Sequence, residues 1–116
     1  MSTFKKQFCF EDRKKESILI KSKYPERYPL IIEKNKRSEI GELEKKKYLV
    51  RNDLTIGQLV FMIRKYIKIE SHTAIFLFIN GSLPPTAATI GQVFKENVDL
   101  DGFLYILYSG ESTFGQ

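Results

Sequence analysis

The chain has 116 residues and a formal net charge of +5, with 42% hydrophobic and 28% charged residues. This length suits one domain that buries roughly two-thirds of its unfolded surface, and the composition excludes a fibrous repeat, a disulfide scaffold and extended disorder. The chain has one cysteine, Cys9, and one histidine, His72. A single cysteine cannot form an internal disulfide, which fits a reducing cytosol, and one cysteine with one histidine cannot supply the usual zinc ligand sets. No apolar run has the length of a signal peptide or a membrane span.

The first predicted element is a helix over residues 10–24. It ends there because Pro25 biases Tyr24 away from the helical conformation. Its charged residues lie early, over residues 11–16, and its apolar residues lie late, at residues 18–20. We therefore expect the second half of this helix to dock on the domain and the first half to face solvent.

Two strands are predicted next, over residues 28–33 and 47–51. Both are rich in large apolar and branched residues, and Pro29 stands near the start of the first, where a missing hydrogen-bond donor is tolerated. The charged stretch between them is turn-like around Gly41. These two strands are expected to pair.

The strongest helix signal covers residues 56–69, with Thr55 or Asp53 able to cap its first amides. Helical spacing places one apolar stripe toward the core, formed by Ile56, Val60, Ile63 and Ile67. A second apolar strip lies beside it, formed by Leu59, Met62 and Tyr66. This surplus is explained equally well by a covering loop or helix and by a binding pocket.

The remaining pattern predicts a strand over residues 74–80, a short helix from Thr89 through Phe94, and a strand over residues 103–109. Residues 110–116 have no periodicity. The order of elements predicts an α+β fold with a mixed four-stranded sheet crossed by a central helix, the ubiquitin-like β-grasp.

An enzyme is not expected from the residues. Cys9 lies near the N-terminus and His72 lies in a polar turn, so a nucleophile and a base are far apart. The chain also has no phosphate-binding loop and no dinucleotide-binding fingerprint.

Two kinds of binding module remain open. A nucleic-acid module would use the cations of residues 45–47 with Arg64 and Lys65, although nearby glutamates dilute that charge. A protein-binding module would use residues 48–50 as an exposed sheet edge to which a peptide adds a strand, with the lysines attracting acidic residues of the peptide. The second hypothesis explains the charge and the surplus apolar surface together.

Seven short motifs follow one another along the chain. They are Lys23-Tyr24-Pro25-Glu26-Arg27, Ile40-Gly41-Glu42-Leu43, Lys45-Lys46-Lys47-Tyr48-Leu49-Val50, Asp53-Leu54-Thr55-Ile56-Gly57-Gln58, Pro84-Pro85-Thr86, Phe103-Leu104-Tyr105-Ile106 and Tyr108-Ser109-Gly110-Glu111-Ser112. In this order they resemble the ubiquitin-like autophagy modifiers, the family of the GABA-receptor-associated proteins and the microtubule-associated light chains. The pattern is closer to the receptor-associated branch, and the resemblance runs from about Phe10 to Gly115.

The resemblance implies a non-catalytic modifier with additional N-terminal helices. A cysteine protease would remove Gln116, and activating and conjugating enzymes would join Gly115 to phosphatidylethanolamine, with no other cofactor and no metal. The protein would move from the cytoplasm to autophagosomal membranes and recruit cargo receptors that carry an aromatic-x-x-aliphatic motif, and no nucleic acid is expected as a partner. The implied parts are a helical extension (1–27), a ubiquitin-like domain (28–109) and a flexible conjugation tail (110–116).

Matching positions imply two peptide pockets and several contacts to partners. The first pocket, for the aromatic residue, would be lined by Glu16, Ile20, Pro29, Ile31, Lys47, Leu49 and Phe103. The second, for the aliphatic residue, would be lined by Tyr48, Val50, Leu54, Leu59, Met62 and Ile63. Arg27, Lys45 and Arg64 would contact acidic residues of partners, and Phe76 and Phe78 match a surface that the processing protease uses, or are simply a buried strand.

Two residues depart from the family pattern. Arg51 stands where relatives often have proline, and Leu59 where many have phenylalanine. We expect both to touch the second pocket, where added charge and a changed shape would alter the preference for partners.

Overall fold

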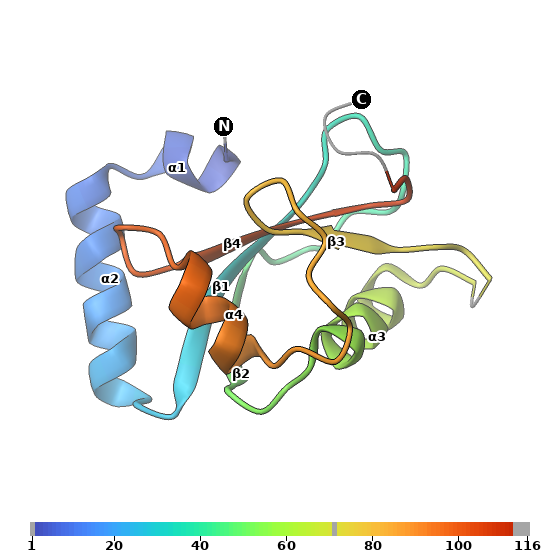
Figure 1. Ribbon diagram of the computed structural model, residues 1–116. Coiled ribbons are helices and arrows are strands. Elements are labelled where there is room, and N and C mark those ends of the chain that lie inside the picture. The colour runs from blue at the N-terminus through green and yellow to red at the C-terminus, as the bar shows by residue number, and fades with distance from the viewer. Residues whose placement is uncertain (1, 71, 113–116) are drawn as a thin grey trace.

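The computed structural model describes residues 2–70 and 72–112 (Figure 1). Its elements in chain order are α1 (Thr3–Gln7), α2 (Phe10–Lys23), β1 (Arg27–Lys34), β2 (Lys47–Arg51), α3 (Ile56–Ile67), β3 (Phe76–Phe78), α4 (Ile90–Asn97) and β4 (Leu104–Ser109). The predicted order of elements is confirmed, and β2 has its predicted bounds. Strand β3 is shorter than expected and α4 longer, and α1 is too short for its sequence period to be recognised.

The four strands form one mixed sheet in the order β2-β1-β4-β3. Strand β1 pairs with β2 in antiparallel and with β4 in parallel orientation, and β3 pairs with β4 in antiparallel orientation. The predicted mixed sheet and the predicted pairing of its first two strands are thus confirmed. Strands β2 and β3 lie at the edges.

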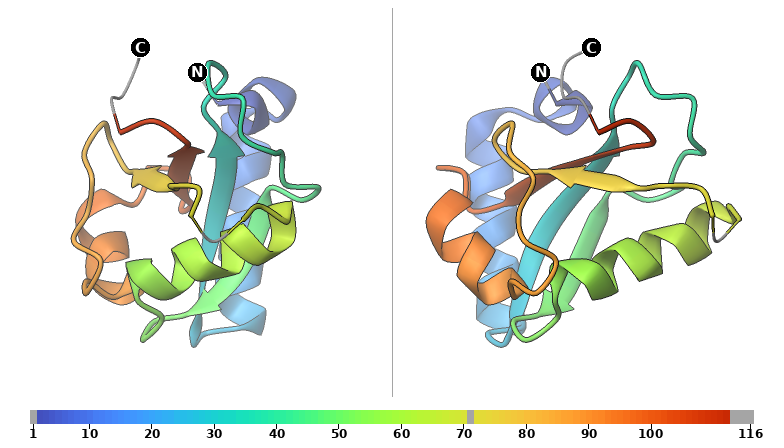
Figure 2. Two further views of the ribbon diagram at one scale, coloured as in Figure 1. Left: turned by 90° about the vertical axis from the view of Figure 1, so that its right-hand side faces the viewer. Right: turned by 45° about the vertical axis from the view of Figure 1, so that its right-hand side comes forward.

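The sheet is covered on both faces (Figure 2). On the inner face, which we define as the one toward α3 and α4, Leu30, Leu104 and Ile106 belong to the main core cluster. On the outer face, toward α1 and α2, Ile31 and Phe103 form a smaller cluster. Since β1 contributes to both clusters, its residues 29–32 are buried without alternation, as expected for a strand covered on both sides.

Helices α3 and α4 begin with the same capping arrangement. The hydroxyl of Thr55 accepts from the backbone N–H of Gln58, whose side chain accepts from the N–H of Thr55, and Thr89 and Gln92 repeat the pair. Each arrangement satisfies two backbone donors that the first helical turn leaves open. The predicted starts of both helices are confirmed.

The core-facing stripe of α3 differs from the predicted one. Its buried residues are Ile56, Leu59 and Ile63, whereas Val60 and Ile67 are only partly buried. Leu59 was expected in the surplus strip, but its side chain is fully buried in the main core cluster. The stripe is therefore rotated by about one residue, because the sheet lies against the side of α3 that carries Leu59.

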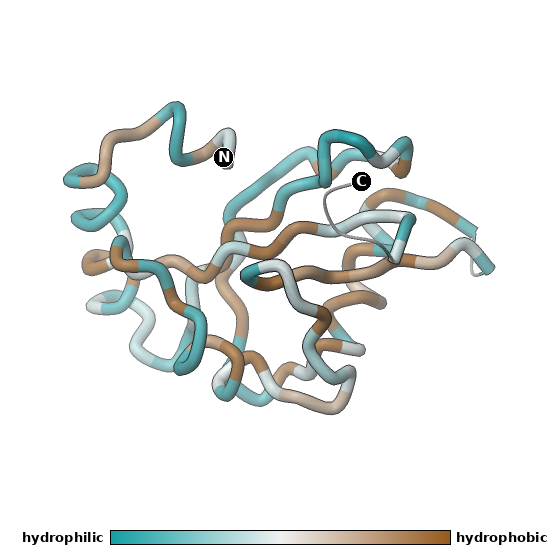
Figure 3. The backbone as a smooth tube through the Cα atoms, turned by 45° about the horizontal axis from the view of Figure 1, so that its top comes forward, coloured by the Kyte–Doolittle hydropathy of each residue, from teal (hydrophilic) through white to brown (hydrophobic). Residues whose placement is uncertain are grey.

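Helix α2 docks mainly through polar residues, with Ile20 packed on the outer-face cluster. The prediction that its second half docks holds for Ile20 but not for Ile18 and Leu19, and the prediction that its first half faces solvent was wrong for Arg13. The buried residues of α2 are Arg13 and Ser17, while Ile18 and Leu19 are 58% and 62% exposed. Colouring by hydropathy shows brown along the strands and stretches of teal along the N-terminal helices (Figure 3). Within residues 2–70 and 72–112 no helix is long and apolar enough to cross a bilayer.

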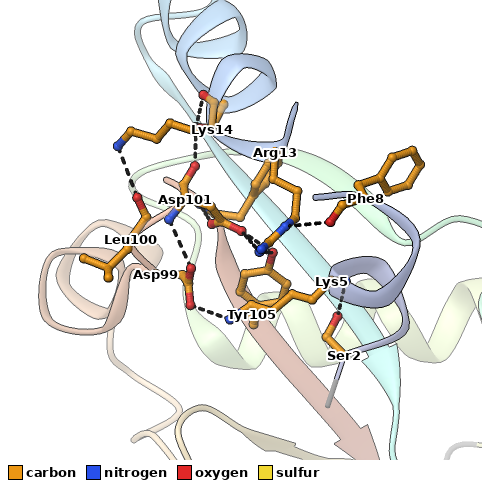
Figure 4. A network of polar contacts seen from close by, with 11 residues as sticks. Ser2, Lys5, Phe8, Arg13, Lys14, Asp99, Leu100, Asp101 and Tyr105 are labelled. Carbon is orange, nitrogen blue, oxygen red and sulfur yellow. Dashed lines mark hydrogen bonds and ion pairs between the residues drawn. The ribbon is translucent and has the colours of Figure 1, made fainter. Parts of the chain in front are cut away.

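The docking of α2 centres on Asp101, which is fully buried in the turn before β4 (Figure 4). The Arg13 guanidinium donates to the Asp101 carboxylate at 2.7 Å, and the Tyr105 hydroxyl donates to the same oxygen. The Ser17 hydroxyl donates to the Asp101 backbone carbonyl. We call these four residues the polar clamp, since they join α2 to β4.

Candidate functional site

The candidate site is the edge strand β2 with the side chains on its two faces. Its register with β1 pairs Lys47 with Ile31, Leu49 with Pro29, and Arg51 with Arg27. Because side chains alternate between the faces of a strand, these pairs lie on the outer face, and Tyr48 and Val50 lie on the inner face. Beyond β2 the sheet has no further strand among the described residues, so its backbone edge faces outward.

The structure brings the residues predicted for the first pocket to the outer face. Ile31 and Phe103 are fully buried and cluster with the partly buried Ile20. An ion pair joins Lys47 on β2 to Glu16 on α2 and closes one side of the region. The pairing of Leu49 with Pro29 continues the surface along the strands.

Phe4 of α1 belongs to the same region and was missed by sequence reasoning. It is 4% exposed, and its ring packs against Phe103 with the centroids 5.4 Å apart. The Lys47 ammonium lies 6.0 Å from the centre of the Phe4 ring. The N-cap signal of Ser2, whose side chain accepts from the N–H of Lys5, could have indicated the short helix that positions it.

The residues predicted for the second pocket lie at two depths on the inner face. Tyr48, Leu54 and Met62 are partly buried and pack around the core, and Val50 is 7% exposed. Leu59 and Ile63, in contrast, are fully buried and lie beneath this layer. The partly buried residues therefore form the accessible surface of this region.

Two tyrosines complete the inner face. The rings of Tyr48 and Tyr66 stack with their centroids 6.2 Å apart, and the Tyr48 hydroxyl donates to the Lys45 carbonyl at 3.1 Å. Burial, with smaller contributions from Tyr66, Tyr108 and Glu44, raises the pKa of Tyr48. Its hydroxyl therefore stays neutral at physiological pH and remains a donor.

The predicted electrostatic contacts lie in different settings. Arg27 and Lys45 are exposed, but the Arg64 guanidinium donates to the carbonyls of Glu70 and Thr73 at 3.0 and 2.5 Å. Arg64 thus holds the loop that follows α3.

Arg51 lies opposite Arg27 on the outer face, so the expectation that it touches the second pocket was wrong. Phe78 is 3% exposed, which agrees with a buried strand, and Phe76 is partly buried. Gly115 and Gln116 lie outside the described residues.

Residues 12–115 match the family described as "Autophagy protein Atg8 ubiquitin like". The chain belongs to the Atg8 family. It is 55% identical over 114 residues to Autophagy-related protein 8 of Schizosaccharomyces pombe, covering 98% of this chain and 94% of that one. It is 51% identical over 114 residues to Autophagy-related protein 8c of Arabidopsis thaliana, covering 98% and 96%.

Solved structures of Atg8 proteins share the fold. The crystal structure of Trypanosoma brucei ATG8 superimposes with a TM-score of 0.91 at 40% identity and covers 99% of both chains. Plasmodium falciparum Atg8 in complex with an Atg3 peptide gives a TM-score of 0.88 at 34% identity, covering 98% of this chain and 100% of that one. The predicted family and the predicted ubiquitin-like fold are confirmed, so this is an autophagy protein of the Atg8 family. The assignment to the receptor-associated branch stays a prediction.

Proposed function

We propose that this Atg8 protein is a non-catalytic modifier that is joined to phosphatidylethanolamine through Gly115. A cysteine protease hydrolyses the bond between Gly115 and Gln116, and the activating enzyme then uses ATP to activate the freed glycine carboxyl group as an enzyme-bound cysteine thioester. The lipid amine attacks this thioester, so that the amide forms and the enzyme thiol leaves. Activating and conjugating enzymes carry out this transfer, and the lipid moves the protein from the cytoplasm to autophagosomal membranes. Two findings support the proposal: the family match extends to residue 115, and a related Atg8 is bound to a peptide of Atg3.

Lipid transfer is tested by reconstitution with the activating and conjugating enzymes, ATP and vesicles that contain phosphatidylethanolamine. We expect a chain that ends at Gly115 to become lipidated without the protease, and the full chain to require it. Gly115→Ala should block transfer. Normal lipidation of the alanine variant would refute the proposal, and indifference to Gly115 with steeply salt-dependent binding to single-stranded nucleic acid would favour the basic module instead.

We further propose that β2 binds the aromatic-x-x-aliphatic motif of cargo receptors. One observation carries this proposal: β2 is an edge strand, and the residues on it that were predicted for the two pockets lie on opposite faces. A peptide that adds a strand to β2 alternates its side chains, so residues three apart point to opposite faces. The spacing of the motif therefore delivers the aromatic residue to the outer face and the aliphatic residue to the inner face.

Titration calorimetry with a motif peptide tests this groove. Lys47→Ala combined with Leu49→Ala should weaken binding at least about tenfold, because both side chains lie on the outer face of the edge strand. Lys95→Ala, at an exposed position on α4, is the matched control. Circular dichroism must show that the double variant remains folded, and unchanged affinity of the folded variant would contradict the groove.

A further inference from the structure

Within residues 2–70 and 72–112, and leaving tyrosines aside, five polar or charged residues are buried: Arg13, Ser17, Ser38, Asp101 and Ser109. Three of them belong to the polar clamp. The other two are serines on different elements, since Ser109 ends β4 and Ser38 lies in the loop that follows β1. A buried hydroxyl is costly unless it makes hydrogen bonds, so the partners of these two serines indicate their role.

Both serines hold the backbone at the point where the chain leaves β4 (Figure 1). The Ser38 hydroxyl accepts from the N–H of Gly110 at 3.0 Å, and the Ser109 hydroxyl accepts from the N–H of Glu111 at 3.1 Å. The Ser109 hydroxyl also donates to the Glu111 carboxylate at 3.0 Å. The first two backbone donors after β4 are therefore each paired with a buried side chain.

The loop that carries Ser38 is itself fixed to the sheet. The Ser38 hydroxyl accepts a second hydrogen bond from the N–H of Ile40 at 3.3 Å, and the Lys34 ammonium donates to the Ser38 carbonyl at 2.5 Å. The Ser38 N–H donates to the Asn35 carbonyl at 3.0 Å, and the Asn35 N–H donates to the Tyr108 carbonyl of β4 at 2.8 Å. Ser38 is thus a fixed point of the fold to which Gly110 is attached.

The attachment lies close in sequence to the glycine proposed for conjugation. Gly115 is four residues beyond Glu111, so the length of the chain keeps it within about 14 Å of that residue. An enzyme that acts on Gly115 must order the tail in its active site. Each residue that is ordered beforehand removes conformational entropy that would otherwise be lost on binding.

We propose that Ser38 and Ser109 are positioning residues for the enzymes that act on Gly115. By holding Gly110 and Glu111 they fix the point at which the tail leaves the fold, and they shorten the segment that an enzyme has to order. This role rests on the proposed function. Both serines act through the backbone and not on the reacting glycine, so they affect binding of the tail rather than the chemical step.

The test uses the full chain and the processing protease, with loss of Gln116 followed by mass spectrometry to give KM and kcat. Ser38→Ala and Ser109→Ala are compared with the wild-type protein and with Ser22→Ala, a control at an exposed position on α2. A further variant keeps both serines and carries a glycine and a serine inserted between Glu111 and Ser112. This insertion lengthens the free tail without a change in the core.

Two further measurements report on the fold itself. Thermal unfolding shows whether each variant is folded, and nuclear magnetic resonance gives the amide exchange rates of Gly110 and Glu111 without any enzyme. In the wild-type protein both amides should exchange slowly, because both are hydrogen-bonded to buried hydroxyls. Exchange of the Gly110 amide should become faster in Ser38→Ala, and exchange of the Glu111 amide should become faster in Ser109→Ala.

We expect KM to rise about fivefold in each alanine variant and in the insertion variant, with kcat unchanged, because more of the tail must be ordered on binding. The Ser22 variant should match the wild-type protein. An unchanged KM in a folded alanine variant, or a loss confined to kcat, would overturn the positioning role and leave the proposed function intact.

The insertion variant decides the question if an alanine variant does not fold, because its core is that of the wild-type protein. An unchanged KM of the insertion variant would then overturn the positioning role. Failure of the protease to remove Gln116 from the wild-type protein would refute the proposed function, and the positioning role with it, even if both amides exchange slowly.

Discussion

Helices α2 and α3 cover opposite faces of the same sheet but are held there by different forces. Helix α3 buries Ile56 and two further aliphatic side chains, whereas α2 buries Arg13 and Ser17. Apolar burial is non-directional and scales with area, but the polar clamp depends on the positions of a few donors and acceptors. The comparison indicates that α3 belongs to the cooperative core, while the N-terminal helices form a layer that can open locally.

The turn before β4 is built for the polar clamp. Gly102 has a φ of +93°, a conformation that other residues rarely adopt, and an added Cβ would lie 2.3 Å from the Ser17 Oγ. The Phe103 N–H donates to the Asp101 carboxylate at 2.9 Å, which fixes that side chain toward α2. Glycine thus permits the close approach on which the clamp depends.

The largest effect should come from the apolar packing of α3 against the sheet. Leu59→Ala removes a fully buried side chain from the main core and should lower the free energy of unfolding by about 4 kcal/mol. Denaturant unfolding measures the loss, and it should appear as one transition for the whole chain. Leu100→Ala, at a leucine that is 84% exposed, is the matched control and should change little. A small loss at Leu59 would mean that it is not part of the cooperative core.

The second-largest effect should distinguish α2 from α3, because it should weaken only the docking of the N-terminal helices. Asp101→Asn keeps the shape of the side chain but leaves the Arg13 charge buried without its ion pair, at a cost of about 3 kcal/mol. Hydrogen exchange should become faster in α1 and α2 and stay nearly unchanged in α3. Asp12→Asn, at an exposed position on α2, is the control. Equal acceleration in α2 and α3 would show that the N-terminal layer is not separable.

The sequence predicted those parts of the fold that rest on periodic apolar patterns. Strand β2 was predicted with its observed bounds, and α3 was predicted from its cap to within two residues of its end. The docking of α2 was not predictable in this way, because the partner of Arg13 lies 88 residues away in a turn without a pattern of its own. Polar contacts between distant residues leave no periodic signal.

The candidate site shows the same limit. The resemblance supplied residues on both faces of β2, and the structure brings them together along one edge. It did not supply Phe4, because the resemblance begins only at about Phe10, and a helix of five residues has too few turns for a recognisable apolar stripe. It also assigned Arg51 to the second pocket, although alternation along β2 places Arg51 on the same face as Lys47 and Leu49.

The smallest effect should come from α1, where Lys5 forms a partly exposed ion pair. The Lys5 ammonium and the Asp99 carboxylate lie 2.6 Å apart, with about a quarter of each side chain exposed (26% and 27%). Burial alone would raise the pKa of Asp99, but hydrogen bonds from Lys5 and the Asp101 N–H, together with the Lys5 charge, outweigh it and lower the pKa. A lowered pKa means that the ion pair stabilises the fold above the unfolded value of about 3.9 and that this contribution is lost as the pH falls through the folded value.

Lys5→Gln should therefore cost at most about 1 kcal/mol near pH 6, and the difference from the wild-type protein should shrink below about pH 4. Comparing the two proteins at each pH cancels the titration of the other carboxylates. Lys6→Gln, at the exposed neighbouring position, should show no such difference at either pH. If the Lys5 variant loses the same stability at pH 3 as at pH 6, the ion pair does not anchor α1, and the other contacts of this layer, including the polar clamp and the packing of Phe4, hold it without that pair.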